Sequence, residues 1–148
     1  MIKIIGSVIF ILGGFLLGRS MDMKYKEKEE FWRESSEFVT FCETEIAYNG
    51  SDMEKISNKI RQSGKKYSEI MADCIQNKKT LPPETNVISD FISELKSTDL
   101  STQKKVFDNY TKIINKKIQT AQNDRKQKGK AYSKLIPLLC IGMVIVLW

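Results

Sequence analysis

Hydrophobic residues gather at the two ends of this chain, and charged residues fill the part between them. The stretches 4–17, IIGSVIFILGGFLL, and 135–148, LIPLLCIGMVIVLW, contain no Lys, Arg, Asp or Glu. Each can extend into neighbouring residues to approach the roughly 20 residues that span a bilayer as a helix. The pattern predicts a membrane helix over 1–18, a soluble domain over 19–130 and a second membrane helix over 131–148.

Each terminal stretch has a second interpretation. With Lys3 ahead of its apolar core, the first also fits a signal peptide, but residues 17–21 contain no small-x-small cleavage site. The second would otherwise be a buried core helix or an amphipathic tail, yet it has no polar face. We therefore favour two membrane helices that are both retained.

Basic residues flank both apolar stretches on the side of the middle domain. Arg19 and Lys24 follow the first stretch, and Lys130 and Lys134 precede the second. Since basic flanks stay in the cytoplasm, we expect the middle domain to be cytoplasmic and to contact anionic membrane lipid. The net charge is +6, but no basic platform with aromatic residues accompanies it, so the sequence disfavours nucleic-acid binding.

Two glycines in the first stretch form a GxxxG element, Gly14 and Gly18. Small residues let membrane helices approach one another closely, so both are candidates for membrane helix packing. The partner helix could be the second apolar stretch, another copy of the chain in a homo-oligomer, or a different protein. Glycine is also common in membrane helices, and the motif alone does not choose among these possibilities.

The middle domain has helical periodicity throughout. Apolar residues recur at steps of three and four over 22–48, 51–63, 66–76, 82–97 and 101–130. In the first of these helices the predicted core positions are Phe31, Ser35, Phe38, Phe41, Cys42 and Ile46.

The predicted helix ends follow from turn and cap residues. Asn49-Gly50 and Gly64 end helices, Ser51 with Glu54 predicts a capping box, and Pro82-Pro83 opens the fourth helix. The fifth helix continues into the membrane, where Pro137 only kinks it. No stretch alternates as strands do. The sequence predicts an all-α, antiparallel cytoplasmic helix bundle with one transmembrane helix at each terminus.

The sequence offers little for catalysis. Histidine is absent, and no phosphate-binding glycine loop, Ser/His/Asp set or metal-ligand cluster occurs. The cysteines, Cys42, Cys74 and Cys140, form no CxxC and are typical of reduced thiols packed as small hydrophobes. Glu43 and Glu45 are two residues apart, so on a helix they point in different directions and cannot act as an acid/base pair. We expect no enzyme activity, no cofactor and no metal.

Two segments carry a resemblance to a known family. The first helix ends in FCETEIAY, residues 41–48, just before a turn, and residues 91–99 read FISELKSTD. Together with the apolar ends, this order resembles the stage III sporulation protein AB family over the whole chain. Family members usually have a Leu-Gly-x-x-Asp turn where this chain has Lys96-Ser97-Thr98-Asp99.

The resemblance implies a role in sporulation. The family acts in the mother cell of endospore-forming bacteria, in the membrane that surrounds the forespore, as part of a channel apparatus between the two cells. It is similar to the inner-membrane platform protein of type II secretion and type IV pilus systems. The resemblance therefore implies a non-enzymatic platform or adaptor that couples a cytoplasmic secretion-type ATPase to other membrane proteins of the channel.

Carried to this chain, the resemblance makes Glu43, Glu45 and Tyr48 the candidate partner contacts. They lie at the end of the first helix away from the membrane, where acidic side chains can pair with Arg or Lys of an ATPase. A structural interpretation stays open, in which Glu43 or Glu45 caps the next helix and Tyr48 packs under the turn. The alternative function is a membrane-tethered helical scaffold or sensor unrelated to secretion.

Overall fold

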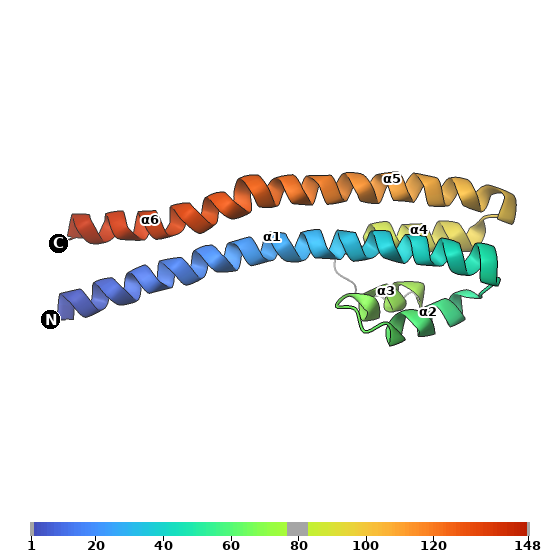
Figure 1. Ribbon diagram of the computed structural model, residues 1–148, viewed down its shortest axis with the longest axis horizontal. Coiled ribbons are helices and arrows are strands. Elements are labelled where there is room, and N and C mark those ends of the chain that lie inside the picture. Colours follow the sequence, from blue (N-terminus) through green and yellow to red (C-terminus); the bar gives the residue numbers. More distant parts are fainter. Residues whose placement is uncertain (1, 77–82, 148) are drawn as a thin grey trace. The chain divides into compact units, whose positions relative to one another are not determined.

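The computed structural model describes residues 2–76 and 83–147, and within them every regular element is a helix (Figure 1). The predicted all-α class is confirmed. The α-helices are α1 Ile2–Asn49, α2 Met53–Gln62, α3 Ser68–Ile75, α4 Asn86–Ser97, α5 Leu100–Asp124 and α6 Lys130–Leu147. A 3-10 turn, η1 Pro83–Thr85, precedes α4, and a π-helical segment, η2 Arg125–Gly129, joins α5 to α6.

The chain divides into two compact units. The central unit is Phe31–Lys117, and the terminal unit combines Met1–Glu30 with Ile118–Trp148. Both α1 and α5 run through the border between the units, so each unit takes part of the same two helices.

Helix α1 joins the first apolar stretch to the polar segment without a break, and it is 48 residues long. The sequence predicted a membrane helix over 1–18 and a separate helix over 22–48. Residues 19–30 are mostly good helix formers, without Pro or Gly, so nothing interrupts the backbone there. Lys26 and Glu30 add an exposed i,i+4 ion pair, with Nζ 3.7 Å from Oε1.

The core of the central unit is built around Phe91 of α4, whose side chain is fully buried. Its ring meets Phe38 of α1 and Phe107 and Tyr110 of α5, with centroids 6.2, 5.7 and 5.2 Å away. Such offset and edge-on aromatic contacts add to the free energy of burying the rings. Helices α1, α4 and α5 are therefore held together by one aromatic cluster.

Most predicted core positions of the first helix are buried, but the stripe is wider than the sequence indicated. Phe41 and Ile46 are only half-buried. Trp32 and Val39, which we did not predict, are 3% and 1% exposed. They lie next to the predicted positions because the rest of the unit covers a wider face of α1 than a single stripe of residues.

The predicted capping box at Ser51 and Glu54 is wrong. Helix α2 begins at Met53, and its N-cap residue, Asp52, makes no side-chain capping hydrogen bond. Ser51 instead donates from Oγ to Glu45 Oε2 at 2.7 Å. A charged acceptor forms the stronger hydrogen bond, so the serine turns back to α1 rather than forward to α2.

The helix over 82–97 begins later than predicted. Pro82 lies outside the described residues, Pro83 starts the 3-10 turn, and α4 starts at Asn86. The fifth helix continues toward the C-terminus as predicted, and Pro137 lies inside α6 without ending it.

In the terminal unit, glycines of α1 lie against α6. A Cβ at Gly14 would collide with Cys140 Sγ, and one at Gly18 would lie 3.2 Å from Ser133 Cα. The outward faces are apolar and exposed, as in Ile9 and Leu139, which are 65% and 66% exposed. Over Ile5–Asn49 and Ser101–Val146 the helices are long and apolar enough to cross a membrane, so both are candidate spans.

Candidate interaction site

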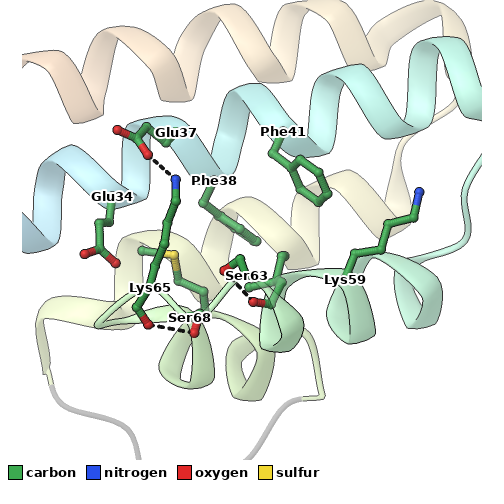
Figure 2. A pocket seen from close by; sticks show the side chains of 10 residues that line it. Glu34, Glu37, Phe38, Phe41, Lys59, Ser63, Lys65 and Ser68 are labelled. Atoms are coloured by element: carbon green, nitrogen blue, oxygen red, sulfur yellow. Dashed lines mark hydrogen bonds and ion pairs between the residues drawn. The ribbon is translucent and has the colours of Figure 1, made fainter.

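A hollow of about 210 Å³ opens between α1 and the α2–α3 pair in the central unit (Figure 2). We call it the α1–α2 groove. Its apolar lining comes from Phe38 and Phe41 of α1, Ile60 of α2 and Met71 of α3. The first two side chains reach the groove because they lie on the same face of α1, at a step of three residues. The polar lining residues are Glu34, Glu37, Lys59, Ser63, Lys65 and Ser68.

The charged residues of the groove are paired with one another or with nearby groups. Lys65 Nζ binds the carboxylate of Glu37, as Figure 2 shows. Glu34 Oε2 accepts a hydrogen bond from the backbone N–H of Tyr67 at 2.9 Å. Lys59 is held by Glu45 at 2.6 Å. Because the groove has an apolar lining and the charges at its rim are already paired, it suits an apolar side chain better than a free ion.

Glu45 is a structural clamp at the end of α1. Only 7% of the residue is exposed. Oε1 accepts from Asn49 Nδ2 at 3.1 Å, while Oε2 accepts from Ser51 Oγ at 2.7 Å and Lys59 Nζ at 2.6 Å. The hydrogen bond from Lys59, followed by that from Ser51, holds the pKa of Glu45 below its ordinary value. The carboxylate thus ties the last turn of α1 to the following loop and to α2.

The other two candidate contacts, Glu43 and Tyr48, are more exposed than Glu45. Glu43 is half-buried. Tyr48 is 85% exposed at the last turn of α1, so the interpretation that it packs under the turn is wrong. The inner side of that turn is taken by Glu45 with its donors Asn49 and Ser51. The structure therefore does not bring the three predicted residues into one cluster.

Sequence reasoning missed the groove itself. Glu34, Glu37, Phe38 and Phe41 recur at steps of three and four, which could have marked one face of the first helix. Lys59 and Lys65 come from beyond the turn. Their place beside that face depends on how α2 and α3 fold back, and no local pattern gives it.

The described residues offer no metal site, and two of the cysteines lie in the core. Among them, no group of three or more His, Cys, Asp or Glu could hold a metal ion. Cys42 and Cys74 are buried, and burial raises the pKa of both thiols. A thiol that resists ionisation is a poor nucleophile, so both cysteines serve as core side chains.

The comparison with family models decides the identity of the chain. A family model described as Stage III sporulation protein AB matches residues 3–81 and 54–148. The chain belongs to the stage III sporulation protein AB family. Membership implies a role in the stage III sporulation machinery, and the resemblance inferred from FCETEIAY and FISELKSTD is confirmed. A search of curated proteins and a search of solved structures each found no match.

In this member of the family, the two motif segments contribute mainly to the core. FCETEIAY supplies the buried Cys42 and Glu45, and FISELKSTD supplies the buried Phe91, Ile92 and Leu95. The spacing of the buried residues in both segments is therefore explained by packing in the core. Within FCETEIAY, Tyr48 is the large apolar side chain that stands exposed, while Phe41 and Ile46 are half-buried.

Proposed function

We propose that this protein is a membrane-anchored, non-enzymatic adaptor that couples a cytoplasmic secretion-type ATPase to membrane proteins of the sporulation channel. One observation carries the proposal. Among the described residues of the central unit, Tyr48 is the large apolar side chain that stands exposed, at 85%, while the others are buried or half-buried. Exposed tyrosine is a typical anchor of protein interfaces.

The α1–α2 groove supports the same function. Phe41 lies in the groove and Tyr48 lies two helical turns further along α1, at a step of seven residues that keeps them on the same face. A partner helix or loop that placed an apolar side chain in the groove could cover Tyr48 as well. Glu43 and Glu45 remain the proposed acidic contacts for Arg or Lys of that partner. The partner can reach only the part of the Glu45 carboxylate that its own hydrogen bonds leave accessible.

The proposed anchoring follows from the terminal unit. Residues 1–18 and 131–148 would span the membrane, and 19–130 would face the mother-cell cytoplasm at the membrane surrounding the forespore. The exposed apolar surface of the two candidate spans and the basic residues beside them support this arrangement. Gly14 and Gly18 are the proposed residues of membrane helix packing, because each lies where α6 comes close to α1.

Co-purification of the ATPase with the full-length protein from solubilised membranes tests the proposal. Tyr48→Ala should reduce the recovered ATPase about tenfold or more, as expected for an interface hot spot. Glu43→Ala should give a smaller reduction, because a single charge at an interface rim contributes less. Membrane insertion should stay unchanged in both variants.

Two controls separate contact from folding. Thr40→Ala changes a solvent-facing residue of the same helix and should bind the ATPase normally. In Glu43→Ala combined with Glu45→Ala, loss of folding would show that the pair is structural. If Tyr48→Ala recovers as much ATPase as the parent, the proposed contact is wrong. If the parent itself recovers none, the alternative of a scaffold or sensor unrelated to secretion is favoured.

A further inference from the structure

The packing face of the second terminal helix shifts by one residue at the junction of α5 and α6. Ile118, Ala121 and Arg125 follow steps of three and four. Continued with the same seven-residue repeat, these positions would reach 128, 132, 135 and 139. The residues at those positions are exposed: Lys128, Tyr132, Leu135 and Leu139. The covered positions come one residue later instead: Gly129, Ser133, Ile136 and Cys140.

The extra residue lies in η2, Arg125–Gly129, where the backbone is π-helical. The N–H of Lys130 bonds to the carbonyl of Arg125, five residues back. A π-turn contains one residue more than an α-turn, so it absorbs a one-residue offset between two α-helical segments. In an α-helix one residue corresponds to a rotation of about 100°. The π-turn therefore sets the facing of α6, which would differ by about 100° if the same residues formed an unbroken α-helix.

Both ends of η2 are held against α1. At one end Arg125 Nη1 lies 3.1 Å from Oε2 of Glu29, a residue that is 8% exposed. Arg125 Nε also lies 3.9 Å from Asp22 Oδ1. At the other end Gly129 is buried, and a Cβ there would come 2.9 Å from the same Asp22 oxygen. A charge contact and a close backbone approach thus fix the first and last residues of the π-segment.

Beyond η2, the α6 side chains meet the glycines of α1. A Cβ at Gly18 would lie 3.2 Å from Ser133 Cα and 3.4 Å from Pro137 Cδ. A Cβ at Gly14 would lie 3.0 Å from Cys140 Cβ. If η2 became α-helical without losing a residue, α6 would turn by about 100° and carry Ser133 and Cys140 away from these glycines.

We propose that η2 is a phase-setting joint, in which one extra residue turns α6 so that it faces the glycines of α1. The contact of Arg125 with Glu29 favours the π-helical form of the joint. A partly buried ionic contact is well suited to this task, because it fixes the register of two helices even where it adds little stability. The joint does not depend on the groove or on the partner proposed above.

Disulfide trapping in membranes tests the joint in the full-length chain. Gly14→Cys places a Cβ 3.0 Å from that of native Cys140, which is about 0.5 Å closer than a disulfide requires, so α1 and α6 must separate slightly and Cys140 Sγ must rotate as the bond forms. Copper phenanthroline serves as the oxidant. Cleavage of the chain between the two positions, followed by a non-reducing gel, shows whether the halves stay linked.

A single and a double deletion give opposite expectations in the Gly14→Cys background. Deleting Gln127 removes the extra residue, so η2 should become α-helical while α6 keeps its facing, and the disulfide yield should match the parent. Deleting both Gln127 and Ala131 removes one residue more than the joint can absorb, so Cys140 should turn away and the yield should fall at least tenfold. Loss of the disulfide on deletion of Gln127, failure of that variant to accumulate in the membrane, or full yield in both deletions would overturn the joint.

A third variant tests the ionic contact. Glu29→Gln should lower the disulfide yield severalfold by favouring the rotated form. Deleting Gln127 in the Glu29→Gln variant should restore the disulfide yield, because α6 then keeps its facing without a π-helical segment. A general loss of folding would lower the yield in both variants, and unchanged yield in Glu29→Gln would show that the ionic contact does not hold the joint. Either result contradicts the proposal.

Discussion

Lys59 Nζ lies 2.6 Å from Glu45 Oε2 and so joins α2 to the last turn of α1. Glu45 is nearly covered, whereas the side chain of Lys59 is 48% exposed. The covered carboxylate of Glu45 therefore needs its hydrogen-bond donors, whereas the exposed ammonium of Lys59 can be solvated by water without Glu45. This difference makes Glu45 the residue at which the α1–α2 turn can be tested.

Stability should depend on pH through Glu45. Its folded-state pKa is below the ordinary value of 4.5, because the hydrogen bond from Lys59 and then that from Ser51 favour the charged form. The contribution to stability is present above that ordinary value and is lost as the pH falls through the lowered pKa. Thermal unfolding of the detergent-solubilised chain between pH 6 and pH 3 should show the loss.

Glu45→Gln is the matching variant. It should lower the unfolding midpoint at pH 6 by several degrees and reduce the pH dependence below the ordinary carboxyl pKa. Glu43→Gln, two residues earlier, serves as the control and should keep the parental dependence on pH. An unchanged pH profile in Glu45→Gln would mean that this carboxylate does not hold the turn.

Gly50 should resist replacement by residues with a Cβ. Its φ of +54° lies in the left-handed region, and its neighbours Asn49 and Ser51 are both donors to Glu45. A Cβ in that conformation costs about 1–2 kcal/mol, so Gly50→Ala should lower the free energy of unfolding by that amount. Gly50→Asn should cost less, because asparagine tolerates left-handed backbone. Equal stability of the alanine variant and the parent in urea titrations would contradict the positive φ.

Phe91 should dominate the stability of the central unit. Phe91→Ala removes a fully buried ring that touches three other rings, so the free energy of unfolding should fall by about 3–5 kcal/mol. Denaturant titration can be followed by the fluorescence of Trp32, which is 3% exposed, in a Trp148→Phe background. Tyr48→Ala is the exposed aromatic control and should stay within about 0.5 kcal/mol of the parent. Similar losses in both variants would rule out the aromatic core.

The helices could be predicted from local patterns because amphipathic spacing depends only on near neighbours. Apolar steps of three and four located α1 to α5, and Gly50 and Gly64 marked helix ends, where both residues have positive φ. The cap of α2 could not be predicted in the same way. The spacing of Ser51 and Glu54 predicted a local capping box. Ser51 donates instead to the carboxylate of Glu45, six residues back, which is the better acceptor.

The site was harder to predict because its contacts join distant residues. Lys59 reaches Glu45 across fourteen residues, and Arg125 reaches Glu29 across ninety-six. Neither pair follows from helical spacing. The π-helical segment could not be predicted either, since RKQKG has no local signal and the residues that follow are apolar on every face.

The most direct measurement of the central claim is a count of heat-resistant spores from a strain that lacks this gene and carries chosen variants in its place. We expect the deletion to lower the count far below the parent, the intact gene to restore it, and Tyr48→Ala to fail although the protein reaches the membrane. Microscopy should then show engulfed forespores that collapse or arrest. Normal spore counts in the deletion strain, or full restoration by Tyr48→Ala, would contradict an adaptor that works through Tyr48 in the stage III sporulation machinery.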